Sequence, residues 1–159
     1  MIIIQLILYC LLFTLMVKLA VRNNAINALY FYPKPVQERA VALGLATREK
    51  VSRDMKIFMT AFYLVMLTVL VLIIGLWNSV SDFGTAYLQA VLFLEVMNWY
   101  DGIVIDRLWV GYSKLWLIKG TEDIPYIKTW KQVLIKRLVL TLVWMVGGAV
   151  VAGMIVLIF

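Results

Sequence analysis

The sequence predicts an all-α, polytopic membrane protein with four transmembrane helices arranged as two hairpins. Three observations predict this fold class. First, 64% of the 159 residues are hydrophobic and 15% are charged, whereas an average soluble domain is roughly 45–50% apolar and about 25% charged. Second, four apolar runs are long enough for the ~30 Å hydrocarbon core of a bilayer, which needs about 20 helical residues. Third, almost all basic residues fall in two of the connections between these runs.

The four apolar runs form a single membrane domain over residues 1–159. Backbone polar groups find no water partner in lipid, so these runs must be helical. The first run has no basic residue before it and is followed by positive charge, so we expect a retained helix and not a cleaved signal peptide. The expected spans are Met1–Val21, Ile57–Trp77, Ala86–Asp106 and Leu138–Phe159.

The connections predict the orientation. Loops 22–56 and 107–137 carry seven Lys or Arg residues each, which with Lys18 make up the fifteen in the chain. The short link 78–85 contains one charged residue, Asp82. The positive-inside rule then places both long loops in the cytoplasm, and the link and both termini outside. For a bacterial source, the membrane is the plasma membrane.

The first long loop contains signals for short cytoplasmic helices at the membrane interface. Pro35 suits the first turn of a helix over Val36–Leu43, because its fixed φ favours that position. Gly44 ends this helix. Thr47 is a suitable N-cap for the next helix, which we expect to continue without a break into the second span.

The second long loop is rich in aromatic residues. Trp109, Tyr112 and Trp116 have the spacing of one helix face, on a helix that continues the third span. Asp123 is a candidate cap for a helix that has Pro125 in its first turn and leads into the fourth span.

The basic loops leave two interpretations open. They bind anionic lipid headgroups, or they are topology determinants beside an aromatic belt at the membrane surface. Nucleic-acid binding is not expected, because the basic residues lie on membrane-flanking loops and not on a soluble module with stacking aromatics.

The third span carries polar residues inside the membrane. At 100° per residue, Glu95, Asn98, Gly102 and Asp106 share one face, with Asp101 on its flank. A carboxylate in hydrocarbon costs about 2.5–3.5 kcal/mol on insertion scales, so these groups should face the interior of the bundle.

Each acidic residue of this span has a specific expectation. Glu95 is a candidate proton- or cation-binding group, or a structural group hydrogen-bonded to hydroxyls at similar depth, such as Tyr9 and Thr68. Asp101 lies at nearly the depth of Lys18, so we expect an ion pair between them. Asp106 and its neighbour Arg107 are expected to be interfacial and solvated.

The fourth span has small residues in two overlapping pairs. Gly148 with Ala152, and Ala149 with Gly153, have the four-residue spacing that lets helices approach closely. The pairs predict either packing against another helix of the same chain or formation of a homo-oligomer.

Several kinds of site are excluded by composition. The chain has one cysteine, Cys10, and no histidine. An intramolecular disulfide, His-ligated metal or haem, and His-dependent catalysis are therefore impossible. We expect no catalytic residue, no cofactor and no metal site.

The segment Asp101-Gly102 with Arg107 resembles the opening of the metal-binding motif of CDP-alcohol phosphatidyltransferases. That motif requires a further Gly and two further Asp at four-residue intervals. Here Gly111 is followed by Ser113-Lys114-Leu115, and the Arg is one position late. A site that lacks half of its carboxylates would not hold two divalent ions.

A second resemblance covers most of the chain. The chain resembles a functionally uncharacterised family of small four-helix membrane proteins of Gram-positive, clostridium-like bacteria. The resemblance implies the fold and carries no activity. The matching segments are Phe31–Arg39, Leu43–Thr47, Asp101–Arg107 and Gly120–Asp123.

Three classes of function follow from these features. The first is a non-enzymatic integral membrane protein, a subunit or assembly partner for which the polar third helix provides specificity. The second is a small proton- or cation-linked carrier or channel that uses Glu95. The third is a lipid-modifying enzyme, which would need a cytoplasmic pocket lined by Asp101, Asp106 and several basic side chains. The expected partners are the lipid bilayer, anionic headgroups, and a membrane protein partner or a second copy.

Overall fold

The computed structural model describes residues 1–159 and consists of helices joined by short connections. Four helical stretches are long and apolar enough to cross a membrane, which confirms the prediction of four apolar helices. They are α1 (Ile2–Val21); α3 (Arg48–Leu72) continued by η2 (Ile73–Trp77); α4 (Phe83–Tyr100) continued by η3 (Asp101–Trp109) and α5 (Val110–Tyr112); and α6 (Trp130–Ile158). The connections contain η1 (Ala25–Phe31), α2 (Lys34–Ala42) and η4 (Lys114–Trp116).

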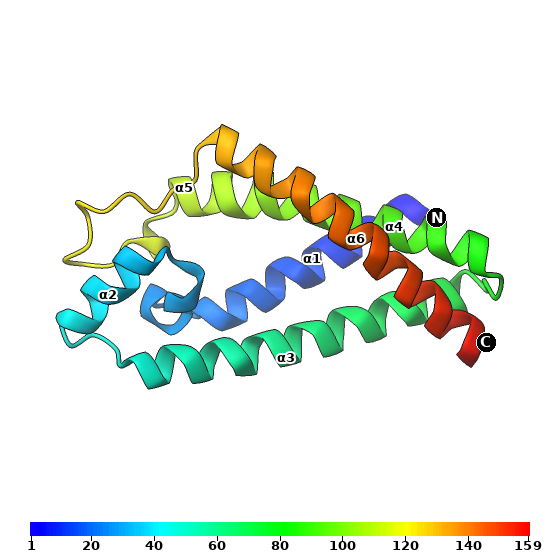
Figure 1. Ribbon diagram of the computed structural model, residues 1–159, viewed down its shortest axis with the longest axis horizontal. Coiled ribbons are helices and arrows are strands. Elements are labelled where there is room, and N and C mark those ends of the chain that lie inside the picture. The colour runs from blue at the N-terminus through cyan, green and yellow to red at the C-terminus, as the bar shows by residue number, and fades with distance from the viewer.

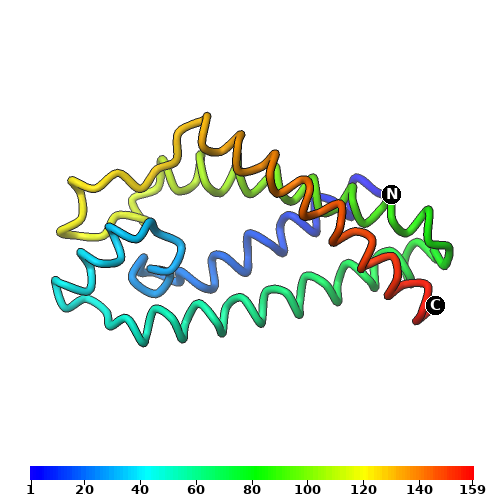
Figure 2. Tube along the Cα trace, viewed as in Figure 1, coloured from blue at the N-terminus to red at the C-terminus, as the bar shows by residue number.

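Successive long helices run in opposite directions along the long axis of the molecule (Figure 1). Both chain termini lie at one end, together with the connection between η2 and α4, and we call this the terminal end. The connections 22–47 and 113–129 lie at the opposite end, which we call the basic end (Figure 2). The most extensive helix contact is between α4 and α6, while α1 contacts both α3 and α4.

The helices of the first long connection begin and end where local chemistry predicts. Pro35 lies in the first turn of α2, and Gly44 follows that helix with a φ of 72°, which costs glycine little. The Thr47 side chain accepts a hydrogen bond from the Lys50 amide at 3.2 Å and caps α3. From this cap the helix continues into the second span without a break.

The start of the fourth helix differs from the prediction. α6 begins at Trp130 and not at Leu138, and no helix starts at Pro125. The reason is a capping box, in which Thr129 and Gln132 each accept a hydrogen bond from the other's backbone amide. Asp123 caps no helix and instead faces Arg39, with 3.3 Å between Oδ2 and Nη2. The basic residues 131, 136 and 137 therefore lie on the helix and not in a loop.

The third long helix changes its backbone pattern at Asp101. η3 is a π-helix, in which hydrogen bonds join residues five apart. The helix ends at Tyr112, so the prediction that Trp109, Tyr112 and Trp116 share one helix face is wrong. Tyr112 is 85% exposed and Trp116 is 2% exposed, because Ser113 breaks the helix and turns the chain.

Small residues of α6 allow close packing toward the terminal end. Gly148 is buried, and a Cβ at this position would lie 2.6 Å from Cγ2 of Val91 on α4. Ala152 is fully buried, whereas Ala149 is half-buried. Gly153 has no other atoms within 4 Å of an added Cβ, so it lies beside open space. The close approach within the chain thus involves Gly148 and Ala152.

Three neutral amide side chains join the helices at the terminal end. Gln5 of α1 is fully buried and donates to Asn78 Oδ1 at 2.6 Å. Asn78 donates in return to Gln5, and to Gln89 of α4 at 2.8 Å. Gln5 and Asn78 both donate and accept, and Gln89 accepts, so this network joins the helices through polar groups without placing charge between them.

Candidate functional site

Arg137 is the centre of the candidate site. Its side chain is only 2% exposed, yet it carries a permanent positive charge. Nη1 lies 2.7 Å from Oδ2 of Asp101, and Nη2 lies 2.6 Å from Oδ2 of Asp106. The guanidinium thus bridges two carboxylates of η3 through two charge-assisted hydrogen bonds, which are shorter and stronger than neutral ones.

The π-helix explains why both carboxylates reach one guanidinium. In an α-helix, residues five apart are separated by about 140° around the axis and face different directions. In η3 the i→i+5 hydrogen bonds bring Asp101 and Asp106 toward one face. Gly102 provides the space, because a Cβ there would lie 2.7 Å from Nε of Arg137.

Further side chains complete the network around Arg137. Asn98 Oδ1 accepts from Nη1 at 3.3 Å, and Nδ2 of the same residue donates to the Arg137 carbonyl oxygen at 3.1 Å. Oδ2 of Asp106 also lies 2.6 Å from Nζ of Lys128 and 3.8 Å from Nζ of Lys136. We call Asp101, Asp106, Lys128, Lys136 and Arg137 the charged cluster. It contains three cations and two anions.

Two predicted features of the charged residues are wrong. The ion pair between Lys18 and Asp101 does not form: Lys18 is exposed, beside the buried Val17, and Asp101 pairs with Arg137. The reason is that α6 begins early enough to carry Arg137 inside the bundle. Asp106 is not a solvated interfacial group. Its side chain is 17% exposed, and three cationic nitrogens lie within 4 Å of its Oδ2.

Glu95 lies beside the charged cluster and has different partners from those predicted. Thr141 of α6 donates to its Oε2 at 2.9 Å, and Oε1 is buried without a hydrogen-bond partner. Tyr9 donates instead to the Met66 carbonyl oxygen, and Thr68 is exposed on the outer side of α3. The hydroxyl that donates to Glu95 thus comes from the fourth helix, and Nδ2 of Asn98 is a longer donor to the same oxygen at 3.5 Å.

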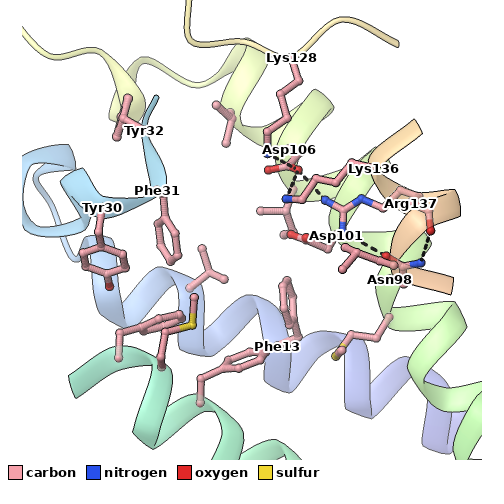
Figure 3. A pocket seen from close by; sticks show the side chains of 18 of the residues that line it. Phe13, Tyr30, Phe31, Tyr32, Asn98, Asp101, Asp106, Lys128, Lys136 and Arg137 are labelled. Atoms are coloured by element: carbon pink, nitrogen blue, oxygen red, sulfur yellow. Dashed lines mark hydrogen bonds and ion pairs between the residues drawn. The ribbon is translucent and has the colours of Figure 1, made fainter. Parts of the chain in front are cut away.

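A pocket of about 560 Å³ opens next to the charged cluster at the basic end. Sixteen of its 23 lining residues are hydrophobic. Figure 3 shows Phe13, Tyr30 and Phe31 on one side, and the charged cluster on the opposite side. We call the aromatic lining residues the aromatic wall. They are Phe13, Tyr30, Phe31, Tyr32, Phe58, Phe62, Tyr63, Trp116, Tyr126 and Trp144.

The tyrosines of the connections add no negative charge to the pocket. Burial and the nearby Asp54 carboxylate raise the pKa of Tyr30 to about 12. Burial raises the pKa of Tyr32, with a smaller contribution from Tyr126, and burial alone raises the pKa of Tyr126. All three phenols are therefore neutral near pH 7 and act as hydrogen-bonding groups.

The acidic residues of the pocket are poorly suited to hold a metal ion. Asp101 and Asp106 are each paired with a cation. Nowhere do three or more His, Cys, Asp or Glu side chains come together as potential ligands. The arrangement combines a large apolar surface with an excess of one positive charge.

The central residue of the site, Arg137, was missed in the sequence because it was assigned to the second long loop. Two signals could have found it. The Thr129/Gln132 pair is a capping-box signature, which starts the fourth helix upstream of Arg137. From that start, Arg137 falls on the same helical stripe as the buried residues Val133 and Gly148.

Comparisons with known protein families, with curated proteins and with solved structures find no match for this chain.

Proposed function

We propose that this chain is an integral membrane protein that binds an amphiphilic small molecule in the pocket at its basic end. The observation that carries the proposal is the division of the pocket into the aromatic wall and a charged wall, which is formed by the charged cluster (Figure 3). An amphiphile has the matching division into an apolar tail and a polar head. The positive-inside rule places the basic end in the cytoplasm, so the binding site would face the cytoplasmic leaflet of the plasma membrane.

The dimensions and the access of the pocket support this proposal. Ligand pockets typically measure about 300–1,000 Å³, are mostly apolar, and contain a few convergent polar groups. The volume of about 560 Å³ and the composition of this pocket fit that description. Met59 and Tyr63 line the pocket and are 39% and 56% exposed, so it reaches the outer surface of α3. A lipid-soluble molecule could therefore enter from the bilayer.

The carrier and enzyme hypotheses have less support. A carrier that uses Glu95 needs a cavity that reaches this residue, but Glu95 does not line the pocket and is bonded to Thr141. A lipid-modifying enzyme needs a pocket with Asp101, Asp106 and basic side chains, and those residues are present. Both carboxylates are held in ion pairs, however, so the geometry favours binding over catalysis.

A membrane subunit is the second candidate function. The observation in its favour is the outward side of α6 at Gly153, where nothing lies within 4 Å of an added Cβ. A small residue on the lipid-facing side of a helix permits close approach of another transmembrane helix. Binding an amphiphile and assembling with a partner helix would use different surfaces.

A matched pair of variants tests the proposed function. Leu140 lines the pocket, whereas Leu138 lies on the same helix, is 54% exposed and does not line it. We expect Leu140→Trp to weaken amphiphile binding roughly tenfold or more, because overfilling a packed site costs about 1–3 kcal/mol. Leu138→Trp should bind as the wild type does.

The measurement is saturable retention of two radiolabelled probes, a long-chain fatty acid and a lysophosphatidylcholine, by the protein in nanodiscs. Empty nanodiscs give the correction for partition into lipid. Saturable binding of either probe that Leu140→Trp lowers and Leu138→Trp does not would support the proposal. Absence of saturable binding for both probes, or equal effects of the two variants, would refute it.

A further inference from the structure

We propose that the pocket selects amphiphiles with an anionic headgroup, a carboxylate or a phosphate monoester, and that Lys136 is the residue that binds the headgroup. The inference rests on the proposed function and adds the chemical class of the ligand. It is supported by the net charge of the residues on the charged wall and by the hydrogen bonds and ion pairs that they make.

The charged cluster has one positive charge more than it can neutralise internally. Arg137 is balanced by Asp101, and Asp106 faces three cations through a single oxygen, Oδ2. Tyr30 and Tyr32 on the opposite side stay neutral, because burial raises the pKa of each, and Glu95 is not part of the lining. An anionic headgroup would therefore meet net positive charge, and a cationic headgroup would be repelled.

Lys136 is the cation of the charged cluster that makes no hydrogen bond. Arg137 and Lys128 both lie 2.6 Å from Oδ2 of Asp106, so that oxygen is already occupied by close donors. Nζ of Lys136 is 3.8 Å from the same oxygen, beyond hydrogen-bond distance, and the side chain is 47% exposed. Figure 3 shows it beside Asp106 on the charged wall. A lysine ammonium has three donors to offer a carboxylate or phosphate.

The indole groups of two lining tryptophans strengthen the preference for a ligand with acceptors. Nε1 of Trp116 and Nε1 of Trp144 are buried and have no hydrogen-bond partner. A buried donor without a partner costs free energy, which an acceptor on a bound ligand would recover.

The test compares headgroups on one chain length in phosphatidylcholine nanodiscs. The probes are a fatty acid, a lysophosphatidic acid, the zwitterionic lysophosphatidylcholine and inorganic phosphate alone. We expect the first two to bind at least roughly fivefold tighter than the zwitterion, the effect of about one basic residue near an anion. Lys136→Gln should remove this advantage and leave lysophosphatidylcholine binding unchanged. Lys136→Arg should retain part of it.

Lys131→Gln is the matched control, because Lys131 is an exposed lysine of the same helix that does not line the pocket. It should leave all affinities unchanged. Since Lys136 makes no hydrogen bond, we expect the melting temperature of Lys136→Gln to stay close to that of the wild type, which separates binding from folding.

Three results overturn the inference. One is equal affinity for anionic and zwitterionic probes while Leu140→Trp still weakens both, in which case the proposed function stands without headgroup selection. Another is an anionic preference that Lys136→Gln does not change. The third is competition by inorganic phosphate alone at the same concentration as the amphiphiles, which would indicate a free-anion site. If no probe binds saturably, the proposed function itself fails.

Discussion

The two ends of the helix bundle differ in the polar groups that lie between the helices. At the terminal end, the neutral amides of Gln5, Asn78 and Gln89 are hydrogen-bonded to one another, and Gly148 lets α6 approach α4 closely. At the basic end, four charged side chains surround Arg137, and the helices leave a pocket of about 560 Å³ beside them.

This difference separates a structural region from a candidate functional one. Neutral amides satisfy one another and leave no net charge, so they hold helices together at little desolvation cost. A buried ion pair contributes little to stability compared with a well-packed apolar contact, but removing one partner is costly. Charge placed next to an open pocket is therefore better explained by ligand binding than by packing.

The largest expected effect is at Arg137. Arg137→Leu leaves Asp101 and Asp106 without their shared partner inside the bundle, and we expect a loss of about 3–5 kcal/mol in unfolding free energy. Thermal or denaturant unfolding in detergent micelles measures it. Lys131→Leu, on the exposed side of the same helix, should cost little.

A combined variant sharpens this test. If Arg137→Leu is destabilising because Asp101 is left unpaired, then adding Asp101→Asn should recover a large part of the loss, while Asp106 keeps its contact with Lys128. A combined variant that is no more stable than Arg137→Leu would instead show that the arginine acts through packing alone.

The next largest effect is expected from closing the space at Gly148. In Gly148→Ala the new Cβ meets Val91 Cγ2 at 2.6 Å, and we expect about 1–3 kcal/mol of packing strain. Gly153→Ala is the matched control, because its Cβ meets nothing and both variants gain the same helix propensity. The difference between the two unfolding free energies isolates the packing contribution.

Gly153 also distinguishes the two roles of the small residues. If α6 forms a homo-oligomer through its outward side, Gly153→Leu should shift the protein toward the monomer in cross-linking in nanodiscs. An unchanged oligomeric state would show that the close helix packing is confined to the chain itself.

The smallest effect is expected in the amide network. Asn78→Ala removes the hydrogen bonds to Gln5 and Gln89, and we expect a loss of about 0.6–1.7 kcal/mol, the range of interhelical hydrogen bonds in membranes. Asn23→Ala, an exposed position at the other end, should have no measurable effect. A loss as large as that of Arg137→Leu would contradict the distinction between the two ends.

The sequence was sufficient to predict the four apolar helices, because apolar length and the need to satisfy the backbone leave few alternatives. The Thr47 cap and the short helix ended by Gly44 were also predictable, since each depends on local chemistry. The pairing of Asp101 with Arg137 was not predictable. It depends on the π-helical register of η3, which residue spacing in an ideal α-helix does not reveal.

The start of α6 shows how one boundary decides the site. Arg137 was placed at the end of the second cytoplasmic loop, outside the fourth span, so Lys18, at a similar depth on the first span, was the predicted partner of Asp101. Recognising the Thr129/Gln132 capping box would have placed Arg137 on the buried stripe and changed that pairing. The pocket was predictable only as a requirement of the enzyme hypothesis, because its aromatic wall comes from segments far apart in the sequence.

The central claim is that the pocket at the basic end binds a ligand. Photolabelling with a fatty acid that carries a diazirine on its chain tests this claim most directly. After irradiation in nanodiscs, peptide mapping locates the labelled residues. We predict that labels concentrate on pocket-lining positions such as Phe58 and Phe62, and that excess unlabelled fatty acid abolishes this labelling. Labels spread evenly over lipid-facing positions such as Leu142 and Val146, and insensitive to competitor, would contradict it.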